Sequence, residues 1–362
     1  MSKIRTIKDF ISRNERVLSP LALVGGFIVD ALTLRRADLL PETVLLYVYL
    51  LTIGLSIILL HLIEQNIWRG RLSQTIRPWL PLALQFVFGS TFSAYLIFYS
   101  KSASIAASWP FLLILLGVFV GAEIFKTYHV RFMFQMSVFY FSILSFCIYA
   151  VPLGLGEIGT NAFLLSGAVS VATFAIFSLV LFVISPGRFK KSARGLLISV
   201  VCIYGMVNAL YFLDILPPIP LSLKDVGIYH LVSKTAAGYQ VEGESYPWPS
   251  LFFSRQVVHV VEGEPIYAYS SVFTPVAITT NVVHNWQYWS ELTSEWVESG
   301  TVAFETNGGR DGGYRGYSFK RAVFPGLWRV RVETPDGRLI GETEFEIVFV
   351  SQAPKLSGQV LE

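Results

Sequence analysis

Continuous apolar runs dominate the first 222 residues of the chain. A helix needs roughly 20 mainly apolar residues to cross a ~30 Å hydrocarbon core. Seven runs meet or approach this length, so the sequence predicts about seven transmembrane helices in an all-α bundle over residues 1–222. The runs cover residues 18–34, 43–63, 79–99, 106–125, 133–152, 162–184 and 196–216.

The pattern changes to strict alternation after the prolines at 217, 218 and 220. Trp328, Val330 and Val332 alternate with polar residues, and a second alternating run begins after the turn sequence Pro335-Asp336-Gly337. Alternation with period two places one face of each run in a core and the other in water. The two runs therefore predict a β-hairpin.

Further short alternating segments fill the rest of the C-terminal region. Eight or nine strands separated by turn residues favour an all-β antiparallel sandwich over residues 223–362. The other strands are expected near residues 227–233, 238–243, 256–261, 265–273, 281–289, 295–304 and 315–321.

Composition supports a membrane protein with two unlike parts. The chain is 53% hydrophobic and only 15% charged, whereas an average soluble domain is about 25% charged. Residues 1–222 hold 17 Lys/Arg and 9 Asp/Glu, and residues 223–362 hold 11 and 16. The basic excess accompanies the apolar runs, which favours a role in topology, and we expect no nucleic-acid partner.

The basic residues between the runs predict an orientation. With seven spans, fourteen Lys/Arg fall on one side and four on the other, and short loops rich in Lys/Arg stay in the cytoplasm. We therefore expect a multi-pass protein of the inner (plasma) membrane. Its N-terminus would be cytoplasmic and its C-terminal domain periplasmic or extracellular.

Four short motifs in the C-terminal region resemble a known family. They are His284-Asn285-Trp286, Tyr314-Arg315-Gly316-Tyr317-Ser318, Gly326-Leu327-Trp328-Arg329-Val330 and Asp336-Gly337-Arg338. Together they are similar to the bacterial domain of unknown function 2914, over roughly residues 250–350. The resemblance implies an uncharacterised membrane-protein family and carries no activity or site residues with it.

Polar residues within the apolar runs are the first candidate sites, because intramembrane ionisable groups are costly and often functional. Asp30 is either such a group or an interfacial residue. His61 and Glu64 share a helix face, and they form either a polar cluster with Glu123 or a helix end that reaches water. Asp214, in the last run, has the same two interpretations.

Aromatic and basic residues are the candidates in the outer domain. His284 and Trp286 lie on one face of a strand, which is either a ligand platform or core. Trp289 offers a flat apolar ring of the kind that saccharides bind, and Arg315 and Lys320 offer anion recognition. None of the three histidines of this domain has metal-ligand spacing with another, and we expect no metal or other cofactor.

Catalytic and cofactor signatures are missing from the sequence. The favoured hypothesis is a membrane-anchored module that binds an envelope glycan or a membrane-protein partner outside the cytoplasm. A transporter or channel-like bundle with the β domain as a cap is the alternative. An envelope enzyme acting on a lipid-linked substrate comes third.

Overall fold

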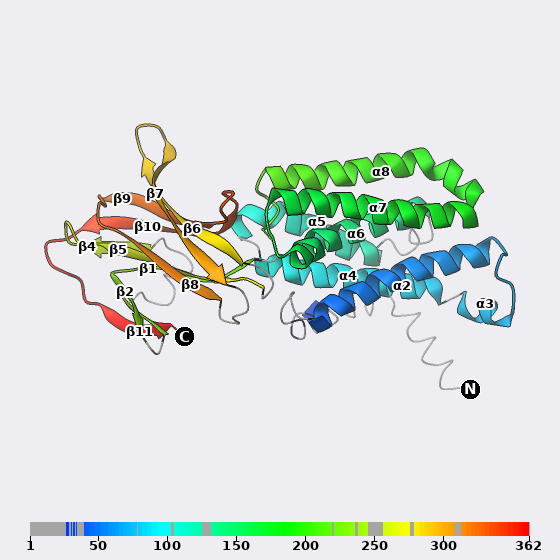
Figure 1. The fold of residues 1–362 in the computed structure, drawn as a ribbon, viewed down its shortest axis with the longest axis horizontal. Helices are drawn as coiled ribbons and strands as arrows, with labels where there is room; N and C mark the ends of the chain where they lie inside the picture. The colour runs from blue at the N-terminus through cyan, green and yellow to red at the C-terminus, as the bar shows by residue number, and fades with distance from the viewer. Residues whose placement is uncertain are drawn as a thin grey trace. The chain divides into compact units, whose positions relative to one another are not determined.

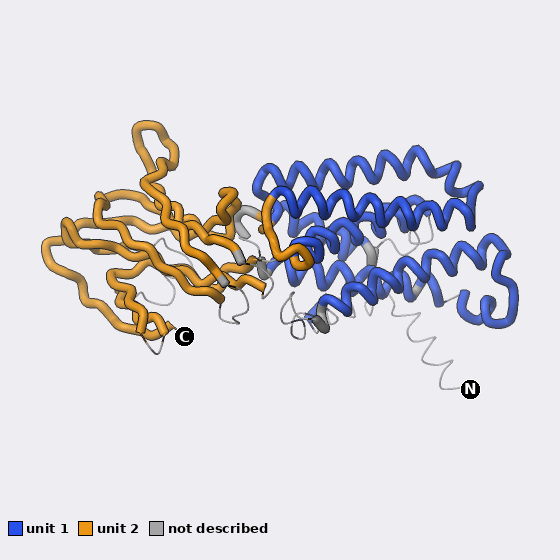
Figure 2. Tube along the Cα trace, viewed as in Figure 1, with its two compact units in different colours: residues 1–101, 109–152, 160–216 blue, residues 102–108, 153–159, 217–362 orange. Residues whose placement is uncertain are grey.

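The computed structural model divides the chain into two compact units (Figure 2). One comprises residues 1–101, 109–152 and 160–216, and the other comprises residues 102–108, 153–159 and 217–362. The structure describes residues 27–28, 30, 32, 34, 40–77, 79–102, 105–124, 132–218, 221–235, 238–244, 256–275, 279–307 and 313–361.

The first unit is helical (Figure 1). Six long helices correspond to six of the seven predicted runs, and the first run, residues 18–34, lies largely outside the described residues. The helices are α2 (Leu40–Glu64), the short α3 (Arg71–Ile76), α4 (Leu80–Ser102), α5 (Ile105–Ile124), α6 (Phe132–Leu155), α7 (Thr160–Ile184) and α8 (Pro186–Phe212).

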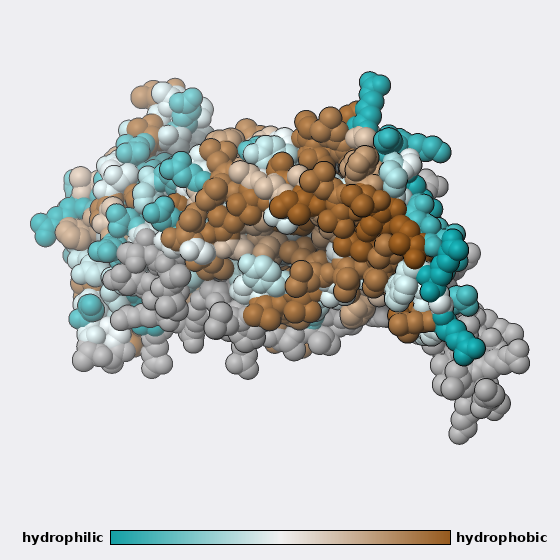
Figure 3. All heavy atoms as spheres, turned by 45° about the vertical axis from the view of Figure 1, so that its right-hand side comes forward, coloured by the Kyte–Doolittle hydropathy of each residue, from teal (hydrophilic) through white to brown (hydrophobic). Residues whose placement is uncertain are grey.

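Four of the described helices are both long and apolar enough to cross a membrane, a finding compatible with membrane association. Their candidate spans are Thr43–Glu64, Phe132–Leu155, Thr160–Ile184 and Pro186–Phe212. Large apolar side chains cover the surface of these helices, as the brown area of Figure 3 shows; Val183 is 78% exposed and Leu51 is 71% exposed. Such a surface is stable in hydrocarbon and costly in water.

Aromatic side chains hold α4 against α6. The hydroxyl of Tyr95 donates to the Ser142 carbonyl at 2.9 Å, and that of Tyr99 donates to the Ser145 carbonyl at 3.0 Å. Both tyrosine rings are almost fully buried. In a low-dielectric interior a satisfied hydroxyl fixes the register of two helices, since losing its partner would cost the full desolvation penalty.

The second unit is an antiparallel-rich set of three sheets (Figure 1). Sheet A has the order β1-β5-β8, sheet B the order β11-β3-β2 and sheet C the order β4-β10-β9-β6-β7. The strands are β1 (Ser222–Tyr229), β2 (Leu231–Thr235), β3 (Gly238–Gly243), β4 (Gln256–Val260), β5 (Ile266–Phe273), β6 (Thr279–Ser290), β7 (Glu295–Asn307), β8 (Tyr314–Lys320), β9 (Gly326–Glu333), β10 (Leu339–Phe349) and β11 (Ser357–Leu361).

The predicted hairpin is present. β9 and β10 pair antiparallel around the turn at Pro335–Gly337, where Gly337 has a positive φ of 81°. The prediction of a purely antiparallel domain is wrong at one strand, because β4 pairs in parallel with β10. The alternation of β4 indicates which face is buried, but it contains nothing that sets the direction of a neighbour 89 residues along the chain.

Inward-facing residues of sheets A and C form one apolar core. Ile228, Ile266 and Ala268 come from sheet A, and they pack in one cluster with Trp286 and Trp328 of sheet C, all at most 3% exposed. Alternate residues of β6 and β9 therefore face this core. Their remaining residues form the opposite face of sheet C, which carries the polar groups described next.

Candidate functional site

The family-like motifs meet in a buried hydrogen-bond network. His284 Nδ1 lies 2.9 Å from Ser318 Oγ, and its Nε2 lies 2.7 Å from Ser270 Oγ. Trp286 Nε1 donates to the same Ser318 oxygen at 2.9 Å. Burial lowers the pKa of His284 to about 4. The network joins β6 of sheet C to β5 and β8 of sheet A.

This network settles the two interpretations of His284 and Trp286. His284 is 0% exposed and Trp286 is 2% exposed, so the pair is core and not an exposed ligand platform. Gly316 has a related packing role, because a Cβ there would lie 2.2 Å from the ring of Phe304. The motif residues therefore specify how the two sheets meet.

The opposite face of sheet C carries a cluster of aromatic and polar side chains, here called the Trp–Arg patch. It comprises Gln287, Trp289, Trp296, Arg329 and Glu342. The Trp289 and Trp296 rings pack edge to face across the β6–β7 hairpin, with centroids 5.5 Å apart. Arg329 stacks on Trp296, its guanidinium carbon 4.4 Å from the ring centroid.

Polar contacts hold Arg329 in this position. Its Nε donates to Gln287 Oε1 at 2.7 Å, and its Nη1 lies 3.7 Å from Glu342 Oε2. Partial burial lowers the pKa of Arg329, but a guanidinium remains charged at neutral pH. A planar cation fixed against a half-buried ring leaves little side-chain entropy to lose on binding.

A second charged group adjoins the patch. Arg331 Nη1 lies 2.8 Å from Glu333 Oε1, and Asn285 Nδ2 donates to Glu333 Oε2 at 3.3 Å. Burial raises the pKa of Glu333, although Arg331 opposes the shift. The Asn285 side-chain oxygen makes no hydrogen bond to the described residues. This face is therefore polar, and the Asn285 oxygen on it is left without a hydrogen bond among the described residues.

The other predicted residues of the domain lie elsewhere. Lys320 Nζ donates to the Ser299 carbonyl at 2.8 Å and so ties β8 to β7; burial lowers its pKa. Arg315 lies on β8, and its carbonyl accepts a hydrogen bond from Tyr239. Of the five predicted residues only Trp289 belongs to the Trp–Arg patch.

Sequence reasoning missed Arg329 and Gln287 as parts of a site. The available signal was the alternation Arg329-x-Arg331-x-Glu333 opposite the glutamates of β10, because polar residues at every second position share one sheet face. The sequence does not reveal that β6 lies beside β9. That neighbourhood follows only from the sheet order β9-β6-β7.

A carboxylate shared by two histidines joins β3 to β4. Glu244 follows β3 directly; its Oε1 lies 3.1 Å from His230 Nε2, and its Oε2 lies 2.7 Å from His259 Nδ1. Burial favours a higher pKa for Glu244, but hydrogen bonds from the backbone N–H and ring of His259 and from His230 lower it overall. No metal-ligating group of three appears among the described residues.

The predicted intramembrane pair lies in a polar cluster of the helical unit. His61 is 0% exposed, and its Nδ1 lies 3.7 Å from Glu64 Oε2. Glu64 pairs with Arg188 at the start of α8. Within the described part of the chain, no hydrogen bond of normal geometry reaches either ring nitrogen of His61 or either amide atom of buried Gln135, although the Gln135 side chain lies close enough to interact with the imidazole. His61 is therefore inside the bundle and does not extend to water.

The remaining intramembrane candidates are dispersed. Asp30 accepts a hydrogen bond from Ser93 of α4 at 2.7 Å. Glu123 lies in α5, and its side chain is outside the described part of the structure. Asp214 is exposed, has a φ of 57° and follows the end of α8 at Phe212. Asp214 therefore lies two residues beyond the end of the helix, in a tight turn.

Comparison with known proteins supports the resemblance seen in the motifs. The family model described as "Protein of unknown function (DUF2914)" matches residues 279–347, the segment that runs from β6 into β10. The predicted family resemblance is thereby confirmed for the C-terminal region. No curated protein matches the chain.

One solved structure aligns over much of the chain. It is the Pseudomonas fluorescens alkylpurine DNA glycosylase AlkC bound to DNA containing an abasic site analog. The identity is 13%, with 75% of this chain and 81% of that chain covered and a TM-score of 0.22. At that TM-score nothing about the fold or function of this chain follows from the alignment.

Proposed function

We propose that the protein is a membrane-anchored binding module whose β domain recognises an envelope glycan outside the cytoplasm through the Trp–Arg patch. The observation that carries the proposal is the stack of Arg329 on Trp296 beside Trp289. Half-buried rings offer apolar faces to a sugar, and the partly exposed Glu342 carboxylate offers hydrogen bonds to its hydroxyls.

The architecture we propose for this role has two parts. About seven transmembrane helices anchor the chain, and sheets A and C form a β-sandwich that carries the patch. The ion pair between Glu64 and Arg188 supports the proposed orientation, since α2 ends and α8 begins on the same, cytoplasmic side. The exposed basic residues Lys190 and Lys191 are on that side too.

A thermal-shift experiment on the full chain in nanodiscs tests the proposal. Peptidoglycan fragments and neutral oligosaccharides serve as probes. A ligand at 100 times its dissociation constant should stabilise the domain by ~2.7 kcal/mol, which is a shift on the order of several degrees. Trp296→Ala should abolish the shift, because it removes the ring on which Arg329 rests.

Phe319→Ala is the matched control, since Phe319 is an exposed aromatic residue (52%) on β8 of sheet A. This variant should bind like the wild type. Binding that survives Trp296→Ala would refute the site. If no glycan shifts the melting temperature of the wild type, the proposal that the ligand is a glycan is refuted. A membrane-protein partner then remains as the ligand class.

A transporter or channel-like function is the second candidate, and one observation favours it. His61 and Gln135 are fully buried with unsatisfied polar atoms among the described residues. Buried polar groups without partners are rare in folded proteins, and water or an ion often satisfies them. If water fills this cluster, it would form part of a hydrated path through the helices, as a transporter or channel requires.

A further inference from the structure

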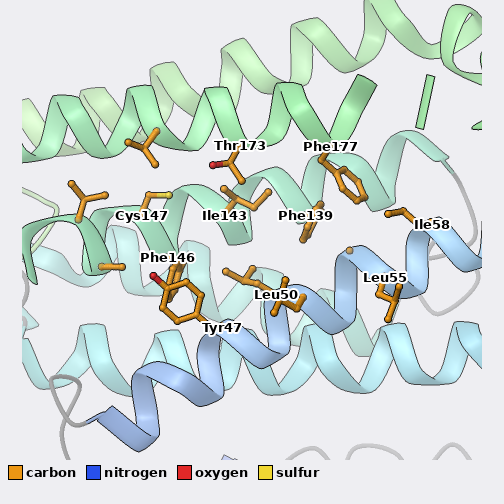
Figure 4. Close-up of a pocket in the computed structure, with 15 residues that line it drawn as sticks. Tyr47, Leu50, Leu55, Ile58, Phe139, Ile143, Phe146, Cys147, Thr173 and Phe177 are labelled. Atoms are coloured by element: carbon orange, nitrogen blue, oxygen red, sulfur yellow. The ribbon is translucent and has the colours of Figure 1, made fainter. Parts of the chain in front are cut away.

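An open groove lies between α2, α6 and α7 within the helical unit (Figure 4). Its volume is about 610 Å³, within the ~300–1,000 Å³ range of typical ligand sites. The lining comes from one stretch of each helix, from Tyr47 to Ile58 on α2, from Phe139 to Val151 on α6 and from Val169 to Phe177 on α7.

The lining of the groove is almost wholly apolar. Tyr47, Cys147 and Thr173 are its only residues with a polar side-chain atom. A polar ligand would lose its hydration here and gain few hydrogen bonds, at a cost of several kcal/mol. The three helices also contribute three of the four candidate spans. The groove therefore suits a hydrocarbon ligand supplied by the bilayer itself.

The length of the groove matches one leaflet. Tyr47 and Ile58 are eleven residues apart on α2, which corresponds to about 17 Å at ~1.5 Å per residue. Half of a ~30 Å hydrocarbon core is about 15 Å. A chain that enters at Tyr47 and reaches Ile58 would pass the middle of the span Thr43–Glu64, because Ile58 lies six residues, about 9 Å, from Glu64.

The two ends of the groove differ in chemistry. At the Ile58 end the rings of Phe139 and Phe177 close it, with centroids 4.7 Å apart. At the Tyr47 end the next turn of α2 brings Thr43, whose Oγ1 lies 2.8 Å from the Tyr149 hydroxyl. Hydroxyl groups at an interface can bond the ester oxygens of a lipid, whereas a phenyl pair can only meet its tail.

We propose that this groove binds one acyl chain of a phospholipid, with the ester end at Tyr47 and the chain end at Phe177. The leaflet is the extracytoplasmic one under the orientation proposed above. A transmembrane helix fits less well, because helix–helix contacts in membranes favour stripes of small residues. Gly54, Ala150 and Thr173 are the only small residues in the lining, and they do not form a stripe on one helix.

Native mass spectrometry of the full chain, extracted in mild detergent, tests occupancy. The wild type should retain one phospholipid. Thr173→Trp fills the groove from α7, so the retained fraction should fall about tenfold, the equivalent of ~1.4 kcal/mol. Ile176→Trp is the control on the same helix, where the side chain is 66% exposed, and it should retain the lipid.

A photoreactive phosphatidylcholine tests the direction of the chain. With a diazirine at the end of one acyl chain, adducts should map to Ile58, Phe139 or Phe177. Adducts at Tyr47 would mean that the acyl chain runs in the opposite direction. An adduct yield at the exposed Val183 equal to that in the groove would show unspecific contact. Either result overturns the proposal.

Two further outcomes of the mass measurement contradict the proposal. A wild type free of lipid would show an empty groove, and equal lipid loss in both Trp variants would place the lipid elsewhere. A cross-link between two copies at the groove would identify a neighbouring helix as the occupant. None of these results depends on glycan binding, so failure here is distinct from failure of the proposed function.

Discussion

At the residue scale, His284 shows how burial turns a conspicuous motif into a structural element. Its ring joins Ser270 and Ser318 across two sheets, and it is completely buried. From the sequence alone a histidine beside a tryptophan on one strand face fits a ligand site equally well. Only the position of β8 against β6 brings Ser318 to the ring, and no local pattern encodes that distance.

The buried imidazole makes stability depend on pH. The pKa of His284 is about 4 in the folded state against 6.5 for the free side chain. Because the folded pKa is the lower one, the stabilisation is complete above pH 6.5 and is lost as the pH falls towards 4. At ~1.4 kcal/mol per unit, the loss is on the order of 3 kcal/mol at most.

His284→Gln should remove this dependence while retaining one donor and one acceptor for the two serines. We expect the wild type to lose more stability than the variant between pH 6.5 and 4, measured by Trp fluorescence during thermal unfolding. Parallel curves for the two proteins would show that folding leaves the pKa of His284 unchanged.

At the element scale, hydrophobic periodicity predicted the helices well and the strand partners poorly. The run at residues 133–152 and helix Phe132–Leu155 nearly coincide, because a continuous apolar segment of that length has one stable form in a bilayer. The start of α8 was missed by ten residues, since its first turns carry Arg188 and Lys190 instead of apolar side chains. The parallel pairing of β4 was not predictable from alternation.

The α2–α6 interface gives a test at this scale. His61 and Gln135 are buried there without hydrogen bonds to any described residue. Replacing a buried unsatisfied polar group by an apolar one of similar size is often neutral or stabilising. His61→Leu should therefore leave the Tm of the full chain in detergent unchanged or raise it.

Leu60→Ala provides the comparison for that experiment. Leu60 precedes His61 on α2 and is 3% exposed, so its truncation should cost about 2–5 kcal/mol. Destabilisation by His61→Leu of comparable size would indicate that water or an ion satisfies the imidazole. That result would strengthen the transport alternative.

At the scale of the whole molecule, the proposed binding function requires each part to lie on a particular side of the membrane. Fourteen basic residues against four predict the orientation, and the binding proposal requires the β domain to be outside. The two native cysteines, Cys147 and Cys202, both lie in helices. Substituting these two residues therefore gives a cysteine-free background.

Sided labelling of two single-cysteine variants tests this claim most directly. Leu292 is 99% exposed at the tip of the β6–β7 hairpin, which projects from the sheets (Figure 1), and Lys191 is exposed near the start of α8. A membrane-impermeant maleimide should label Leu292→Cys in intact spheroplasts and Lys191→Cys only after permeabilisation. The reverse pattern, or labelling of both from one side, would contradict the account.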